Sequence, residues 1–111
     1  MWVFSKCGYF SIVAKNEGTD GLLTVRSRVR SDLVRLKVII PELSEIKDNE
    51  GTDYPFRCTG LSEDVARGMS KITTDINYHN FKNMILEKFG YEREKIYARV
   101  WGVLQGLTTF K

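Results

Sequence analysis

The chain changes character once, at Gly60, and this change constrains the fold more than any other feature. Before Gly60, apolar and polar residues tend to alternate, which is the period-two pattern of a half-buried strand. After it, apolar residues recur three and four positions apart, which is the pattern of amphipathic helices. The sequence therefore predicts a sheet-rich part with one short helix over residues 1–60 and a helical part over residues 61–111.

Two segments of the first part predict paired strands. Residues 2–14 are rich in aromatic and β-branched side chains and are broken in the middle by a glycine, which indicates either one strand or a tight hairpin. Residues 45–47 and 54–59 flank the polar, glycine-containing loop 48–53, which predicts a second hairpin. Pro55 cannot donate to a ladder, so its strand lies at an edge of the sheet or begins there.

Residues 22–29 form the clearest strand and follow a loop predicted for residues 16–21. Apolar side chains of this strand point to one face, and Arg26, Arg28 and Arg30 alternate onto the other face. Three arginines are therefore expected to line one face of the sheet.

Two helices have clear start signals near the sheet. Ser31 or Asp32 can accept hydrogen bonds from the free amides of a first turn, in a helix that Pro41 ends. Ser62 is the expected cap of the next helix, whose acidic first turn suits the helix dipole. Its apolar stripe is Val65, Met69, Ile72 and Ile76.

Two more helices complete the chain. Asn80 is the expected cap of one that Gly90 ends, and the last runs over about residues 92–107 with a broad apolar face. Small residues recur along this last helix and would let another backbone approach closely. They are Ala98, Gly102 and Gly106. They favour packing within the chain or, alternatively, a homodimer interface.

These elements predict a single α+β domain over residues 1–111. An antiparallel sheet of about four strands, in the order β-β-α-β-β, is followed by and covered by the C-terminal helices. The 111 residues have a mass of 12.8 kDa, with 42% hydrophobic and 28% charged side chains, so the chain is an ordinary globular domain and not a multidomain enzyme.

The net charge of +3 is too small to predict a nucleic-acid or membrane partner by itself. Apolar runs are short, and the amino terminus has neither the charged start nor the long apolar stretch of a signal peptide. We therefore expect no membrane partner and a cytoplasmic location, which is the host cytoplasm if a phage encodes the chain.

Residues for catalysis or metal binding are scarce. His79 is the single histidine, and in a polar turn it is more typical of a solvated residue than of a general base. Cys7 and Cys58 are too far apart in sequence for a zinc motif, and they favour two packed thiols over a disulfide. We therefore expect no catalytic residue, no metal and no cofactor.

Binding residues are better supported. A guanidinium group holds a phosphate at two points, and an aromatic ring gives a base a stacking surface. Both types occur together in three clusters, which contain Arg26, Arg28, Tyr54 and Arg57; Tyr78, His79, Asn80, Phe81 and Lys82; and Tyr97, Arg99 and Trp101. The alternative is that the rings belong to the core and the arginines extend into water.

Segments spread over most of the chain carry a resemblance to known proteins. They include WVF at 2–4, GYFSIV at 8–13, RSRVRSDL at 26–33, DYPFR at 53–57, YHNFK at 78–82 and YARVW at 97–101. With these segments the chain resembles a family of small bacterial and phage proteins known chiefly as uncharacterised. In size and layout it is also similar to the phage anti-Thoeris sponges, which bind cyclic ADP-ribose isomers and blind a host defence system. This second likeness is architectural and transfers no pocket residue.

The leading hypothesis is a non-enzymatic, phage-encoded protein that sequesters a small anionic, nucleotide-like signal from a host defence. The arginines hold phosphates, the rings of Tyr54, Tyr78, Phe81 and Trp101 supply stacking faces, and Asn80 reads a polar edge. One alternative is a module that binds nucleic acid or a host protein, such as an inhibitor of a host nuclease. Another is a small enzyme that acts on a phosphorylated metabolite.

Overall fold

The computed structural model describes residues 1–15, 21–49 and 51–111. The described chain divides into two compact units, of which unit 1 is Met1–Ile76 and unit 2 is Asn77–Lys111. Residues 16–20 of the predicted loop and residue 50 of the predicted hairpin connection lie outside the described residues. The predicted α+β class is confirmed, because the described residues form an antiparallel sheet together with α-helices, and most of the helices follow the sheet in the chain.

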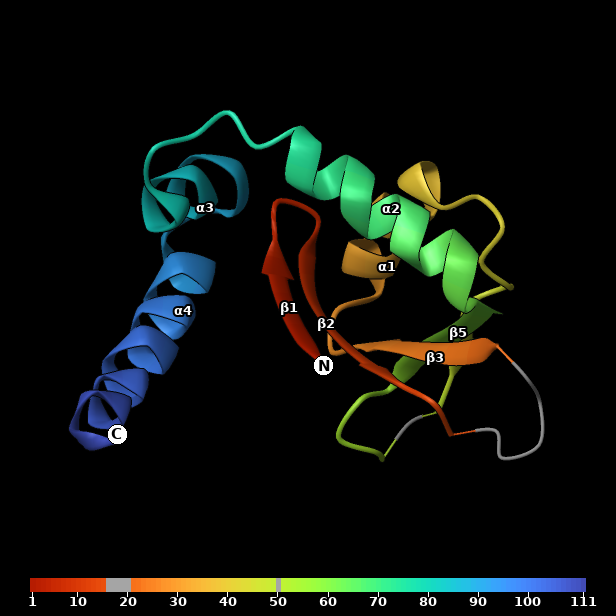
Figure 1. The fold of residues 1–111 in the computed structure, drawn as a ribbon, viewed down its shortest axis with the longest axis horizontal. Helices are drawn as coiled ribbons and strands as arrows, with labels where there is room; N and C mark the ends of the chain where they lie inside the picture. The colour runs from red at the N-terminus through yellow and green to blue at the C-terminus, as the bar shows by residue number, and fades with distance from the viewer. Residues whose placement is uncertain (16–20, 50) are drawn as a thin grey trace. The chain divides into compact units, whose positions relative to one another are not determined.

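Unit 1 holds the whole sheet and two helices (Figure 1). Its elements are β1 (Trp2–Ser5), β2 (Gly8–Val13), β3 (Leu22–Ser27), α1 (Arg30–Ile39), β4 (Lys47–Asp48), β5 (Phe56–Leu61) and α2 (Ser62–Thr74). The strand order is β1-β2-β3-β5-β4, and every neighbouring pair is antiparallel. The sheet has five strands because residues 2–14 form a hairpin. The strand after Pro55 begins at Phe56 and lies inside the sheet, between β3 and β4.

The predicted arginine face needs one correction. The strand over residues 22–29 ends earlier, since β3 stops at Ser27 and Arg30 is the first residue of α1. The Ser27 hydroxyl explains the early end: it accepts a hydrogen bond from the Val29 amide at 3.1 Å and donates to the Val29 carbonyl at 2.9 Å. These local bonds turn the chain out of the ladder, so Arg30 leaves the face that carries Arg26.

The predicted caps of the first two helices are wrong. The residues that precede α1 and α2 are Val29 and Leu61, whose side chains cannot accept a hydrogen bond. Asp32, expected as a cap, lies inside α1 and accepts a hydrogen bond from the Tyr9 amide of β2 instead. Ser62 is the first residue of α2 rather than its cap.

The core of unit 1 lies between the sheet and its two helices. Phe10 and Ile12 of β2 and Val25 of β3 are buried on the face that α1 contacts. In unit 1, α1 and α2 lie together on one side of the sheet (Figure 1). Each such fully buried large apolar side chain stabilises the fold by about 1.5–3 kcal/mol. Among the described residues of unit 1, α1 and α2 both contact the sheet on this side.

Helix α2 belongs to unit 1, because it contacts β3 and β5. The boundary between the units therefore follows Ile76 and not residue 60. Gly68 of α2 permits close packing, since a Cβ built on it would lie 2.2 Å from Ile40 Cγ1. Val65 and Ile72 of the predicted stripe are buried and Met69 is partly buried, whereas Ile76 lies beyond the helix and is exposed.

Unit 2 consists of α3 (Phe81–Phe89), α4 (Tyr91–Leu104) and the short 3₁₀ helix η1 (Gln105–Thr109). Asn80 is confirmed as the cap of α3, because its side chain accepts a hydrogen bond from the Asn83 amide at 3.0 Å. Gly90 ends α3 as predicted, with a positive φ of 93°. The predicted last helix splits into α4 and η1, and Val103 on it is 80% exposed.

Among the described residues, none of the helices combines the length and the apolar character that a bilayer-spanning segment needs.

Candidate functional site

One row of side chains crosses the sheet on the face opposite the core. The strand register places Trp2 beside Ser11, Ser11 beside Arg26, Arg26 beside Arg57 and Arg57 beside Lys47. Directly paired residues share a face of the sheet, so these side chains form one line over all five strands. We call Trp2, Ser11, Arg26, Arg57 and Lys47 the cross-sheet row.

Tyr54 packs against this row and links it to a further arginine. The Arg26 and Arg28 guanidinium carbons lie 4.5 Å and 4.8 Å from the centroid of the Tyr54 ring, within the range of a cation–π contact. The Arg26 guanidinium also donates to the Ser11 hydroxyl at 2.7 Å, and Arg57 Nε donates to the Tyr54 carbonyl at 3.1 Å. The predicted cluster of Arg26, Arg28, Tyr54 and Arg57 is therefore brought together in unit 1.

Aromatic rings continue the site towards the edge strand β1. The Phe4 ring stacks on the Tyr9 ring at a centroid distance of 4.5 Å, and the Trp2 ring meets it edge-on at 6.5 Å. Tyr9 in turn hydrogen-bonds the Tyr54 hydroxyl at 2.8 Å. Trp2 is 71% exposed, so its ring offers a stacking surface at the end of the cross-sheet row.

The cations of this site form no ion pair among the described residues. Within residues 1–15, 21–49 and 51–111, no carboxylate lies within ion-pair distance of Arg26, Arg28, Lys47 or Arg57. Like charges directly opposite one another across strands are destabilising, and Arg57 has a cation on each side. In addition, Arg26 Nε is buried without a hydrogen-bond partner among the described residues. A bound anion would reduce the electrostatic repulsion between these cations.

The hydrogen bond between Tyr9 and Tyr54 and the neighbouring arginine charges shift the pKa values of both tyrosines. Burial raises the pKa of Tyr54, but hydrogen bonds from Tyr9, Ser11 and Arg28, together with the Arg28 charge, outweigh it and hold the pKa below its usual value. Burial and the hydrogen bond to Tyr54 raise the pKa of Tyr9 above its usual value. Tyr54 is therefore the more acidic member of the pair.

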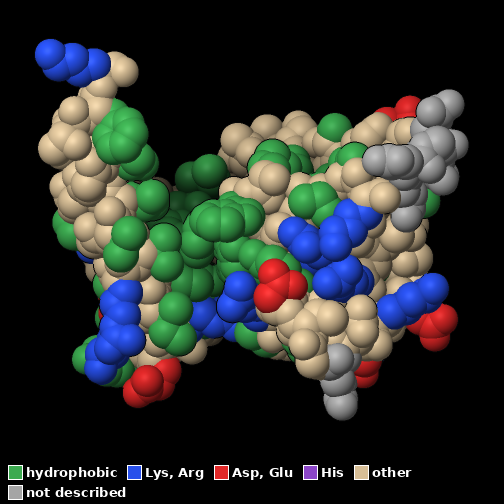
Figure 2. Space-filling model, turned by 90° about the horizontal axis from the view of Figure 1, so that it is seen from below, with side chains coloured by type: hydrophobic (Ala, Val, Ile, Leu, Met, Phe, Trp, Pro, Cys, Tyr) green, Lys and Arg blue, Asp and Glu red, His purple; other side chains and the backbone are tan. Residues whose placement is uncertain are grey.

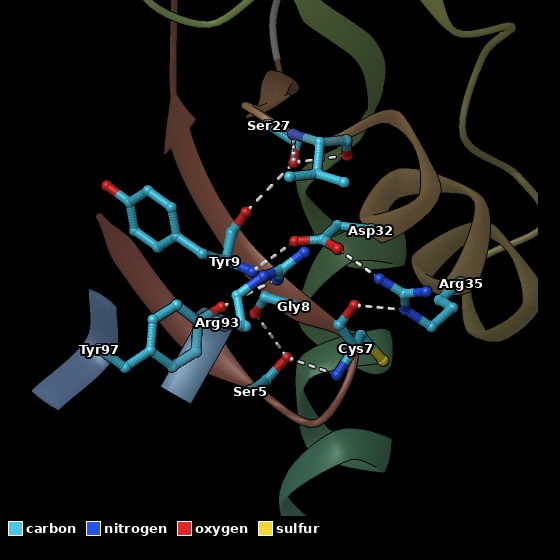
Figure 3. Close-up of polar contacts among 10 residues, drawn as sticks. Ser5, Cys7, Gly8, Tyr9, Ser27, Asp32, Arg35, Arg93 and Tyr97 are labelled. Atoms are coloured by element: carbon cyan, nitrogen blue, oxygen red, sulfur yellow. Dashed lines mark hydrogen bonds and ion pairs between the residues drawn. The ribbon is translucent and has the colours of Figure 1, made fainter. Parts of the chain in front are cut away.

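A buried carboxylate fixes Tyr9 in place (Figure 3). Asp32 of α1 is 1% exposed, accepts a hydrogen bond from the Tyr9 amide at 3.1 Å and forms an ion pair with Arg35. Arg35 Nε donates to the Cys7 carbonyl at 2.9 Å, which ties α1 to the turn between β1 and β2. Gly8 is required there, because its φ is +134° and a Cβ would lie 2.2 Å from Asp32 Cγ.

Arg57 and Lys47 border a shallow hollow at the β4 end of the row. Its volume is about 360 Å³, and Ser44, Glu45, Cys58 and Thr59 complete its lining. The Glu45 carboxylate is the acidic group of this lining, and it contributes an acceptor beside two cations. Figure 2 shows Lys and Arg side chains gathered beside hydrophobic ones on the face that it presents.

The second predicted cluster lies entirely in unit 2. The Tyr78 and Phe81 rings are 6.0 Å apart, and Phe81 stacks on the buried Tyr97 at 6.1 Å. Lys82 Nζ lies 4.3 Å from the centroid of the Trp101 ring. These contacts join residues of the second and third clusters across α3 and α4.

Two predicted residues have other surroundings. The Asn80 amide oxygen is engaged as the cap of α3, which leaves its NH₂ group for a ligand. Arg99 is exposed on α4, two positions away from Trp101 along the chain but not beside it on the helix surface.

Sequence reasoning missed Trp2, Tyr9, Ser11 and Lys47 as site residues. A signal for two of them exists in β2, where Tyr9 and Ser11 alternate with the apolar Phe10 and Ile12 and therefore face away from the core. The place of Trp2 and Lys47 in the row depends on strand register, which pairs segments far apart in the sequence.

The histidine and the two cysteines are not members of the cross-sheet row, although Cys58 borders the shallow hollow. His79 is exposed in the segment before α3. Cys7 and Cys58 are both buried free thiols, as the sequence favoured, and burial raises the pKa of Cys58 to about 11. In the part of the chain that the structure describes, no three His, Cys, Asp or Glu side chains gather to hold a metal ion.

Comparisons with protein-family models, with curated proteins and with solved structures give no match for this chain.

Proposed function

We propose that the chain binds a phosphate-bearing, nucleotide-like ligand on the sheet face that carries the cross-sheet row and does not change it chemically. The observation that carries this proposal is the gathering of Arg26, Arg28, Arg57 and Lys47 around the buried Tyr54 ring and in line with the exposed Trp2 ring, with no carboxylate within ion-pair distance among the described residues. A phosphate would neutralise these cations, and a base would stack on an exposed ring.

The side chains at this site favour binding over catalysis. Guanidinium groups stay charged at all accessible pH values and cannot exchange protons with a substrate. The buried Tyr54 hydroxyl is occupied by its hydrogen bond to Tyr9. Binding without turnover agrees with both features.

Isothermal titration calorimetry tests the proposal with AMP, ADP, ADP-ribose and cyclic nucleotides. We expect binding by the native chain and an affinity at least about 10-fold lower for Arg28→Gln, because a hydrogen bond to a charged group contributes about 1.5–3 kcal/mol. Arg67→Gln is the matched control, since Arg67 is exposed on α2 and pairs with Glu42. The ligand recovered from the complex should have an unchanged mass. Absence of heat with every member of the panel, or a changed mass, would contradict the proposal.

We further propose that the apolar surface of α4 and η1 pairs with the same surface of a second copy. Large apolar side chains are exposed along it, namely Ile96, Trp101, Val103, Leu104, Leu107 and Phe110. Residues 100–110 include no charged residue, so two copies would meet without repulsion. A Cβ built on Gly102 or Gly106 would meet no described atom within 4 Å, which leaves room for another backbone.

Sedimentation equilibrium between about 1 and 100 μM tests this pairing. We expect reversible dimerisation of the native chain and its loss in Leu104→Glu, which places a charge in the apolar surface. Ser70→Glu, on an exposed position of α2, adds the same charge away from this surface and should leave the dimer intact. A native chain that stays monomeric over the whole range would overturn the pairing.

A further inference from the structure

The cross-sheet row is longer than a single nucleotide. It spans five strands, and neighbouring strands lie about 4.8 Å apart, so its length is about 19 Å. In a stacked strand of nucleic acid, successive nucleotides are about 3.4 Å apart, so this length corresponds to about six nucleotides. A ligand that used the whole row would therefore be a polymer.

The two ends of the row differ in chemistry. Trp2 at the β1 end is exposed and has the Tyr9 ring beside it, which suits an unpaired base. At the β4 end Arg57 and Lys47 are neighbours and border the shallow hollow, which suits backbone phosphates. Arg26 lies between them, so cations follow one another on three adjacent strands.

Most side chains of the row are accessible in unit 1, because Trp2 and Lys47 are exposed and Arg26 and Arg57 are partly exposed, whereas Ser11 is 1% exposed and bonded to Arg26. The row lies on the sheet face opposite α1 and α2, and the hollow beside it is a shallow edge feature of about 360 Å³. A small signal molecule is usually enclosed over most of its surface, whereas single-stranded nucleic acid lies along an open, positively charged track of aromatic rings. A duplex hides its base faces and could not stack on Trp2.

From the length, polarity and accessibility of the row, we infer that its ligand is single-stranded nucleic acid that crosses the strands from Trp2 to Lys47. This inference rests on the proposed function, because it names the class of ligand for the same site. One or more bases stack on Trp2, and successive phosphates contact Arg26, Arg57 and Lys47. Recognition is by stacking and charge, so we expect little dependence on base sequence.

Fluorescence anisotropy with labelled hexamers of DNA and RNA tests the inference, with AMP and a hexamer duplex as competitors. We expect the single-stranded hexamer to bind at least about 30-fold more tightly than AMP, and the duplex to compete poorly. The slope of log K against log salt should be about −2, because each phosphate contact on a single strand contributes about −0.7.

Two variants separate stacking from charge. Trp2→Ala should weaken hexamer binding about 10-fold and leave the salt slope unchanged, because it removes a stacking surface and no charge. Arg57→Gln should weaken binding and also reduce the magnitude of the slope by about 0.7. Arg67→Gln is again the matched control and should change neither quantity. Circular dichroism checks that each variant is folded, and Trp2→Leu replaces Trp2→Ala if the latter is not.

The outcomes distinguish this inference from the proposed function. If AMP binds as tightly as the hexamer, or if the duplex competes equally well, the polymer ligand is wrong and the nucleotide site stands. If neither AMP, the members of the earlier panel nor the hexamers bind, both are wrong. If the hexamer binds tightly and Trp2→Ala and Arg57→Gln leave it unchanged, the ligand lies elsewhere on the chain and the inference is overturned.

Discussion

The hydroxyl groups of Tyr9 and Tyr54 lie 2.8 Å apart and join two rings that are 45 positions apart in the sequence. The bond shifts their proton affinities in opposite directions, lowering the pKa of Tyr54 and raising that of Tyr9. Tyr54 also receives the positive charge of Arg28, so it is the member of the pair that ionises first. Because the Arg28 charge lowers the pKa of Tyr54, titration of this tyrosine reports on the positive charge of the candidate site.

We predict that the tyrosines titrate in separate steps when absorbance is followed with pH. The step of Tyr54 should come below the ordinary tyrosine value and disappear in Tyr54→Phe, and Arg28→Gln should move it upward. In the folded chain, the lowered pKa of Tyr54 stabilises the fold at pH values above the unfolded value, whereas the raised pKa of Tyr9 destabilises it there. The two effects oppose each other, so absorbance is the better measurement. A single step for all tyrosines at the ordinary value would contradict the prediction.

Gly8→Ala should destabilise unit 1. The φ of +134° costs a residue with a Cβ about 1–3 kcal/mol, and the added methyl group meets Asp32 Cγ at 2.2 Å. Urea unfolding measures the loss as a lower midpoint. Ser70→Ala, at an exposed position of α2 away from the proposed dimer surface, is the control and should change the free energy of unfolding by less than about 0.5 kcal/mol. Equal effects of the two substitutions would show that the close approach to Asp32 is not real.

Asp32→Asn should lower the free energy of unfolding by about 2 kcal/mol. It removes the charge that pairs with Arg35 and weakens the bond from the Tyr9 amide. The Arg35 side chain is 33% exposed, so the loss should be smaller than the 3–5 kcal/mol of a fully buried pair. Glu42→Gln breaks the exposed pair with Arg67 and should cost less than about 1 kcal/mol. Chemical unfolding measures the free energy of unfolding of both variants. A smaller decrease for Asp32→Asn than for Glu42→Gln would contradict the proposal that the buried contacts of Asp32 stabilise unit 1.

Neither cysteine should react with a thiol reagent at pH 8 while the chain is folded. Both are buried, and burial raises the pKa of Cys58 to about 11, so little of its thiolate exists at that pH. The reaction should become fast in urea at the concentration where the fold is lost. Reaction of Cys58 at the rate of a free thiol in native buffer, with Cys7→Ser as the background, would show that β5 opens readily.

The local signals of the sequence predicted the elements of the fold well. Alternation marked β2 and β3, and Asn80 and Gly90 marked the two ends of α3 correctly. Caps that depend on distant partners were predicted less well. Asp32 has the chemistry of a cap, but the Tyr9 amide, 23 positions earlier, is the donor that it meets.

The candidate site was partly predictable. Arg26, Arg28, Tyr54 and Arg57 were grouped correctly because Arg26 and Arg28 alternate locally and Tyr54 and Arg57 lie in one short segment. Arg30 was placed wrongly on the same face, because Ser27 ends the strand before it. Trp2 and Lys47 were missed, since only the pairing of β1 with β2 and of β4 with β5 brings them into line with Arg26.

The sequence by itself determined in which segments apolar residues recur with period two and in which they recur with period 3.6, because this spacing is a property of neighbouring residues. These periods identified strands and helices and so determined the fold class. Only the tertiary structure decided which side chains share the sheet face of the cross-sheet row. Strand register couples residues tens of positions apart, and a slip of one residue would turn every side chain of a strand to the other face. Local alternation assigns Ser11 and Arg26 each to one side of its own strand, but only strand register aligns them with Trp2, Arg57 and Lys47 in the cross-sheet row.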